Sequence, residues 1–259
     1  MSSLSNLTLD KAIKFATDAK YREFHRLLSM EGLSGTTTLI DSGTMTFHDG
    51  LACARQHLLI FRQGLYAIDG IGESPTILDV GANIGMASLY FKKQFPNARV
   101  TAFEPDPRLA DIFKKNLNAF GYHVDLVQAA AGTTQGTMSF QPDGGDGGRL
   151  SDSGSEQVQM VRLKDYLSDP IHLLKIDIEG AEFDVLMDCE DKLGSVRNLF
   201  VEYHSMASQP QRLPELLTML RDAGFRLQIQ TDHCAASPFL GPDISSGMDL
   251  RLNVFATRH

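Results

Sequence analysis

The chain has 259 residues, of which 42% are hydrophobic and 22% charged, and its formal net charge is −8. This acidic balance disfavours a protein that grips a nucleic-acid backbone, because such proteins carry a basic surface. The first ten residues lack a secretory pattern, no run approaches the ~18 apolar residues of a membrane span, and the three cysteines are far apart. We therefore expect a cytoplasmic protein with reduced thiols and neither nucleic-acid nor membrane partners.

The first 70 residues form a helical and irregular N-terminal segment in this prediction. Apolar residues recur at roughly helical spacing from Leu9 to Met30. Short β-like pieces follow at 38–40 and 44–47, among Gly, Thr and Ser. This segment either caps the sheet of the following domain, residues 71–259, or forms a wall of its substrate pocket.

From Thr76 onward the pattern alternates between strands and helices. Strands are predicted at 76–80, 99–103 and 123–129, with helices at about 84–94 and 107–119. Pro107 stands near a helix start, where its missing N–H costs little, and Gly121 follows the end of the same helix.

A hairpin or loop insertion interrupts this alternation at about 136–161. Two strands are predicted at 136–140 and 158–161, and the residues between them, 141–155, are rich in Gly, Asp and Ser. This loop is interpreted either as a plain hairpin turn or as a lid that closes over the acceptor.

The strand and helix pattern then resumes to the end of the chain. Strands are predicted at 172–177, 196–203, 225–230 and 250–256, with helices at about 181–187 and from 214 to 223. Alternation of this kind predicts an α/β fold with a mainly parallel, seven-stranded sheet. No helix separates the last two strands, so we expect them to pair antiparallel at an edge.

A glycine turn after the first strand is the strongest functional signal. Asp79 lies inside the strand, Gly81 and Gly85 form the turn, and Glu104 ends the next strand. A strand, a glycine turn, a helix and an acid at the next strand tip form a nucleotide-sized pocket, with the acid placed to accept from ribose hydroxyls. The middle glycine of the dinucleotide pattern is missing. Together with Asp79, this favours S-adenosylmethionine, whose ammonium and sulfonium groups are positive, over NAD.

Three sequence blocks carry a resemblance to a known family. They are Ile77-Leu-Asp-Val-Gly-Ala-Asn-Ile-Gly85, Phe103-Glu-Pro-Asp106 and Leu174-Lys-Ile-Asp-Ile-Glu-Gly-Ala-Glu182, followed by Val201-Glu-Tyr-His204. In this order and spacing they resemble the FkbM family of S-adenosylmethionine-dependent methyltransferases over roughly residues 60–255. The resemblance implies a Rossmann-like class I methyltransferase fold and methyl transfer to a hydroxyl, often on a sugar or a glycosylated natural product. It also implies a set of cofactor-binding residues: Asp79, Gly81, Ala82, Asn83, Gly85 and Glu104.

Three acids and a histidine at two later strand tips are the candidate catalytic residues. Asp177 and Glu179 follow one strand, and Glu202 and His204 end the next. Adjacent strands are ~4.8 Å apart, so their tips reach one substrate. An alcohol becomes a good nucleophile only when a base removes its proton. His204 is the first choice for that base because its ordinary pKa is near neutrality, and Asp177 is the second.

A metal-assisted mechanism is a further possibility at the same strand tips. A hard divalent ion prefers oxygen ligands such as Asp177, Glu179 and Glu202, and could lower the pKa of a bound hydroxyl. The number of ligands that the sequence identifies is too small to assign a metal site. For Glu182, the favourable placement of an acid at a helix start is taken as sufficient explanation.

Three rival functions share part of this pattern. An NAD-dependent oxidoreductase would share the fold and Glu104, a non-catalytic module would bind the cofactor alone, and a nucleic-acid methyltransferase would carry an Asn/Asp-Pro-Pro-aromatic turn. The fourth strand is followed instead by Asp177-Ile-Glu-Gly180, which disfavours the last of these. The expected partner is a small-molecule hydroxyl acceptor that contains a sugar, with polyketide and peptide hydroxyls as alternatives.

Overall fold

A computed structural model of the chain describes residues 17–141, 149–150 and 156–258. The first part of the predicted N-terminal helix and most of the 141–155 loop lie outside these residues. Within them, no helix has the length and apolar character needed to span a membrane.

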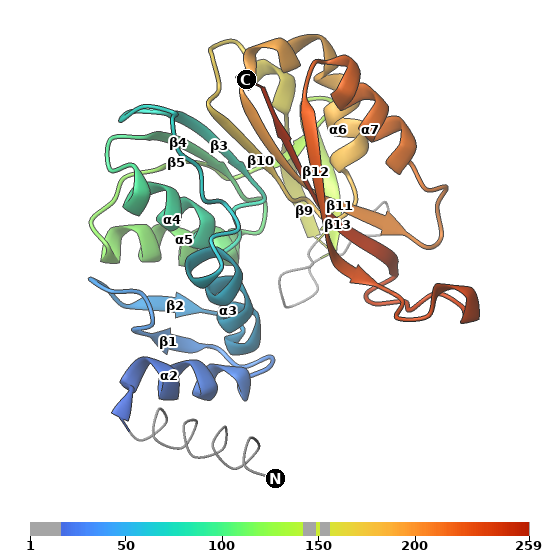
Figure 1. Cartoon of the computed structure of the whole chain (residues 1–259). Helices are drawn as coiled ribbons and strands as arrows, with labels where there is room; N and C mark the ends of the chain where they lie inside the picture. The colour runs from blue at the N-terminus through green and yellow to red at the C-terminus, as the bar shows by residue number, and fades with distance from the viewer. Residues whose placement is uncertain (1–16, 142–148, 151–155, 259) are drawn as a thin grey trace.

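A seven-stranded sheet is the centre of the fold (Figure 1). Its strand order is β12-β13-β11-β10-β3-β4-β5. The bounds are β3 Thr76–Val80, β4 Arg99–Phe103, β5 Asp125–Val127, β10 Leu173–Ile176, β11 Asn198–Met206, β12 Arg226–Cys234 and β13 Met248–Thr257. The predicted α/β architecture is confirmed, and this is the Rossmann-like order of class I methyltransferases.

The last two strands pair antiparallel at one edge, as predicted. The structure adds that β13 lies between β12 and β11 and runs antiparallel to both. The other neighbouring pairs in the sheet are parallel. The chain therefore leaves β3 in one direction towards β4 and β5, and returns on its other side at β10. Crevices for ligands form at such a switch point, beyond the carboxyl ends of the strands.

Helices cover both faces of this sheet (Figure 1). Their bounds are α4 Met86–Gln94, α5 Pro107–Ala119, α6 Glu182–Asp188 and α7 Leu213–Asp222. Side chains alternate between the two faces of a strand. Accordingly Ile77 packs in the cluster that contains residues of α4 and α5, whereas Leu78 packs with residues of α6 and α7.

The N-terminal segment packs on the α4 and α5 side. It consists of α2 Ala19–Leu28, β1 Gly35–Thr37, β2 Met45–Phe47, α3 Gly50–His57 and a π-helical turn η1 Leu58–Arg62. Phe47 and Leu27 are fully buried in the same cluster as Phe113 of α5. The β-like piece expected at 44–47 is present, whereas 38–40 is not a strand and β1 precedes it.

A second, four-stranded sheet holds the predicted insertion. Its order is β6-β9-β7-β8, with β6 Ala130–Gly132, β7 Gly136–Gln141, β8 Arg149–Leu150 and β9 Glu156–Arg162. The strands expected at 136–140 and 158–161 do form an antiparallel pair. The strand expected at 123–129 is shorter, because the chain leaves the main sheet after β5 and enters this one as β6. Three 3-10 turns complete the described elements: η2 Leu163–Tyr166, η3 Glu190–Ser195 and η4 Pro238–Leu240.

Candidate active site

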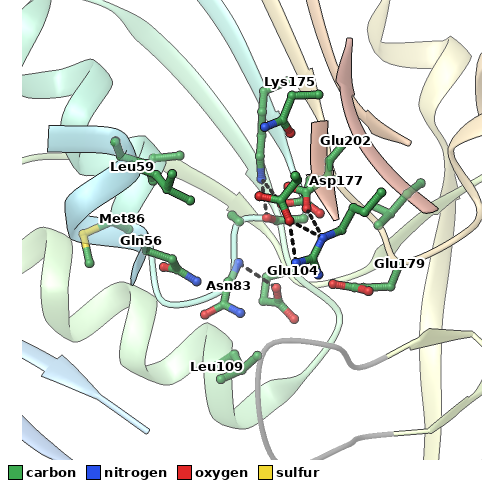
Figure 2. Close-up of a pocket in the computed structure, with 18 of the residues that line it drawn as sticks. Gln56, Leu59, Asn83, Met86, Glu104, Leu109, Lys175, Asp177, Glu179 and Glu202 are labelled. Atoms are coloured by element: carbon green, nitrogen blue, oxygen red, sulfur yellow. Dashed lines mark hydrogen bonds and ion pairs between the residues drawn. The ribbon is translucent and has the colours of Figure 1, made fainter. Parts of the chain in front are cut away.

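A cavity of about 790 Å³ lies at the carboxyl ends of the parallel strands. Residues that follow β3, β4 and β10 line it, together with side chains from α3, η1, β11 and β13. Figure 2 shows Asn83, Glu104, Asp177 and Glu202 converging on this space. The cavity is large enough for a nucleotide-sized cofactor and part of an acceptor.

The glycine turn after β3 forms the floor of the cavity. Gly81 has a φ of +82°, and a Cβ at this position would lie 1.7 Å from the backbone oxygen of Asp177. Only glycine fits here, so the turn and the end of β10 touch through their backbones. Ala82 and Asn83 line the cavity as expected.

Gly85 has a different role from the one the family resemblance implies. It is the N-cap of α4, with a φ of +88°, and a Cβ would lie 2.7 Å from Leu117 and 2.9 Å from Phe113. Both contacts belong to α5, and Gly85 does not line the cavity. This glycine permits close helix packing instead of contacting the cofactor.

Glu104 occupies the predicted position at the end of β4. Its two carboxylate oxygens accept hydrogen bonds from the backbone N–H groups of Asn83, at 2.8 Å, and Asp106, at 2.9 Å. Burial raises its pKa to about 7, although these two hydrogen bonds oppose the change. The carboxylate lines the cavity and is oriented by the turn, as a group that accepts from ribose hydroxyls must be.

Asp79 does not reach the cavity, and its assignment as a direct cofactor contact is therefore corrected. Its side chain is fully buried, and its carboxylate lies 3.2 Å from the ammonium of Lys175 and accepts a 2.7 Å hydrogen bond from Ser88. Lys175 also donates to the backbone oxygen of Gly81 at 2.6 Å and lies 3.6 Å from Asp177. Asp79 thus holds Lys175, which in turn fixes the glycine turn.

Three of the four predicted catalytic residues line the cavity: Asp177, Glu179 and Glu202. Glu179 has a φ of +57° in the sharp turn that leads from β10 to α6, a conformation that non-glycine residues adopt rarely. Burial and the nearby Asp177 raise the pKa of Glu202, while His204 and Arg251 oppose this. The result is a group of carboxylates beyond the end of β10 and beside it in β11, next to the glycine turn.

His204 lies behind these carboxylates. Its side chain is fully buried and is absent from the cavity lining. Its Nδ1 is 2.8 Å from Oε1 of Glu182, a carboxylate that also accepts from the backbone N–H groups of Ile178 and Gly180. Burial by itself would lower the pKa of His204, but Glu182, Glu179 and Asp177 outweigh it and raise the pKa to about 10.

The assignment of His204 as the general base is therefore not kept. Its Nδ1 is engaged by Glu182, and its side chain does not line the cavity in which an acceptor hydroxyl would lie. Glu182 also needs correction, because it is a buried partner of His204 and does more than favour a helix start. This contact has no sequence signature, because the two residues are 22 positions apart and meet only through the packing of α6 on β11.

Other walls of the cavity come from distant segments that no sequence pattern identifies. Arg55, Gln56 and Leu59 reach the cavity from α3 and η1, and Arg251 reaches it from β13. Arg251 lies 3.2 Å from Glu202 and pairs with Asp232. No motif marks these residues, because their place depends on how both ends of the chain pack against the sheet.

The residues present fit S-adenosylmethionine. Glu104 offers a carboxylate that would accept from ribose hydroxyls, and the turn from Gly81 to Asn83 brings backbone against the cavity. Leu109 and Ala131 line the same cavity with apolar surface, which suits the flat face of an adenine ring.

Comparisons with known proteins find relatives that are named as methyltransferases. The chain is 27% identical over 238 residues to the methyltransferase sdnD of Sordaria araneosa, covering 74% of this chain and 90% of that protein. It is 28% identical over 193 residues to the 2-O-methyltransferase NoeI of Sinorhizobium fredii, covering 65% and 78%. It is 29% identical over 215 residues to the 31-O-demethyl-FK506 methyltransferase FkbM of Streptomyces tacrolimicus, covering 67% and 82%.

The model of the methyltransferase FkbM domain matches residues 79–227, which is more than half of the chain and includes the glycine turn, Glu104, the carboxylates that follow β10 and Glu202 of β11. The chain belongs to the FkbM family of methyltransferases, and its cofactor is S-adenosylmethionine.

Proposed function

We propose that the protein is an O-methyltransferase that acts on a hydroxyl of a sugar or a glycosylated natural product. The observation that carries this proposal is the position of the carboxylates. Asp177, Glu179 and Glu202 line the cavity, and the backbone of Asp177 touches Gly81 in the cofactor turn. Carboxylates beside the methyl donor suit an acceptor that donates hydrogen bonds and must lose a proton.

The reaction needs alignment and removal of one proton. When bound, S-adenosylmethionine supplies a methyl group on a sulfonium, whose S–CH₃ bond breaks as the new O–CH₃ bond forms. The carboxylates orient the acceptor hydroxyl and accept its proton. Alignment of the two reacting atoms gives the largest part of the rate, and proton removal adds about 10²–10⁴-fold.

The names of two relatives support oxygen as the acceptor atom. NoeI is described as a 2-O-methyltransferase, and the Streptomyces tacrolimicus relative acts on 31-O-demethyl-FK506. A polyketide or peptide hydroxyl without a sugar is the alternative acceptor. We assign the choice among these to the N-terminal segment, because Arg55, Gln56 and Leu59 form one wall of the cavity.

The test is to incubate the protein with S-adenosylmethionine and a panel of sugars, glycosides, polyketides and peptides. Mass spectrometry detects transfer, and NMR distinguishes a methyl ether from an N- or C-methyl group. We expect a methyl ether with a sugar-containing acceptor and at least a 100-fold lower turnover for Asp177→Asn. The matched control Asp111→Asn changes an exposed acid of α5 and should leave turnover unchanged. Methylation of nitrogen or carbon alone, or full turnover by Asp177→Asn, would refute the proposal.

A further inference from the structure

The ring of His204 is held in one orientation by a buried carboxylate. Glu182 faces Nδ1 at 2.8 Å, and its own position is fixed by two backbone N–H groups, from Ile178 at 3.1 Å and Gly180 at 3.0 Å. Glu182 is 1% exposed and His204 4%. This contact directs the Nδ1 hydrogen to Glu182, so Nε2 is the atom that faces the cavity side.

Nε2 of His204 is buried and has no hydrogen-bond partner among the described residues. It points at the carboxylates: the nearest oxygen of Glu179 is 3.7 Å away and that of Glu202 is 3.6 Å away. These distances are too long for hydrogen bonds. One ligand atom from each of Asp177, Glu179 and His204 can be chosen so that all three lie within 4.8 Å of one another. Two ligands of one ion, each at ~2.1 Å, are at most about 4.2 Å apart, so small side-chain rotations suffice to bring these atoms onto one centre.

We propose that Asp177, Glu179 and His204 bind one divalent cation, with Glu182 as the residue that positions the histidine. A histidine ligand that donates its other ring N–H to a carboxylate is the usual arrangement in metal sites. One imidazole and two carboxylates suit Mn²⁺ better than Mg²⁺, which prefers oxygen ligands throughout. Three protein ligands leave positions open on the side of the cavity.

The use of this ion in catalysis rests on the proposed O-methylation. One or two acceptor hydroxyls would occupy the open positions, and the ion would lower the pKa of a bound hydroxyl. The hydroxyl proton passes to Glu202, which lines the cavity and is not required as a ligand. The oxygen then takes the methyl group as the S–CH₃ bond breaks, which gives a methyl ether, S-adenosylhomocysteine and one proton.

Metal binding can be measured without any acceptor. Protein stripped with EDTA and dialysed is titrated with MnCl₂, and free Mn²⁺ is followed by electron paramagnetic resonance. We expect one saturable site per chain. Glu179→Gln and Glu182→Gln should each weaken binding at least 10-fold, the second without removing a ligand. Glu73→Gln, an exposed acid far along the chain from the site, is the matched control and should bind as the wild type does. Glu179 is at the cavity surface, so its variant is expected to fold even where Glu182→Gln does not.

The outcomes separate this proposal from the proposed function. Absence of a saturable site, or equal affinity of the wild type and Glu179→Gln, overturns the metal site. Formation of the methyl ether at an unchanged rate in EDTA also overturns it and leaves O-methylation intact. Conversely, one Mn²⁺ bound per chain, weakened in Glu179→Gln, supports the metal site even when the methyl group is found on an atom other than oxygen.

Discussion

Removal of the buried charge of Glu104 should change how the stability of the cofactor-free protein depends on pH. Burial raises the pKa of this carboxyl from its ordinary value of 4.5 to about 7. A raised pKa means that the folded protein holds the proton more tightly than the unfolded chain does. The stabilisation is complete below pH 4.5, declines as the pH rises towards 7 and is lost above it.

The size of the effect follows from this difference. Each pKa unit is worth ~1.4 kcal/mol, so the wild type should lose about 3 kcal/mol from this group between pH 4.5 and 7.5. Glu104→Gln removes the titrating carboxyl, so its unfolding free energy should not show this pH-dependent loss. The variant also leaves the backbone N–H of Asn83 or Asp106 without an acceptor, and the cost of that is the same at every pH.

Urea unfolding without cofactor at pH 5 and pH 8 measures this directly. The difference in unfolding free energy between the wild type and Glu104→Gln should shift by about 2–3 kcal/mol in favour of the variant at the higher pH. Other titrating groups are common to both proteins and cancel.

The same variant should bind S-adenosylhomocysteine at least 10-fold more weakly, since a hydrogen bond to a charged group is worth about 1.5–3 kcal/mol. If the unfolding free energies of the wild type and Glu104→Gln changed equally with pH, or if the variant bound S-adenosylhomocysteine as tightly as the wild type, the role given to Glu104 would be refuted.

Three other substitutions test the scaffold of the site. Gly81→Ala combines a φ of +82° with a clash against the backbone of Asp177, and should abolish the thermal shift that S-adenosylhomocysteine gives. Lys175→Met leaves the carboxylate of Asp79 buried without its ion pair and should lower the unfolding free energy by about 3–5 kcal/mol in urea. Phe47→Ala removes a fully buried ring of the N-terminal segment and should cost about 3–5 kcal/mol in a single unfolding transition, because this segment shares a core with α5.

Controls for these substitutions come from the same chain. Gly136→Ala places a Cβ where no atom lies within 4 Å, and Leu33→Ala trims a side chain that is 56% exposed. Both should leave cofactor binding and stability close to wild type. An unfolding curve of Phe47→Ala with two separate transitions would instead show that the N-terminal segment folds on its own.

The sheet could be predicted closely because its strands and helices have strong local patterns. The bounds of β3, β4 and α5 match the sequence prediction, since each is a short, mainly apolar strand or an amphipathic helix bounded by Pro and Gly. The third strand was predicted too long, because the chain leaves the main sheet after β5 and no residue in the sequence marks that departure.

The site was predictable in its outline and less so in its details. Glycine turns and acids at strand tips identify a cofactor and a catalytic edge, because the carboxyl ends of parallel strands always meet. Which of these acids faces the cavity depends on the side of the strand to which its side chain points and on the buried residues with which it pairs. Asp79 pairs with Lys175 beneath the turn, and Glu182 reaches back to His204, and neither contact has a sequence signature.

The contact between Gly81 and the backbone of Asp177 makes donor and acceptor positions mechanically dependent on each other. In the proposed function, Asp177 at the end of β10 is the first of the acceptor carboxylates, and the turn after β3 would hold the cofactor. Because these two stretches of backbone touch, a displacement of one strand end would also displace the other. Substrate preference can therefore be retuned from the walls, at Arg55, Gln56 and Arg251, while the distance that methyl transfer requires stays set by two touching stretches of backbone.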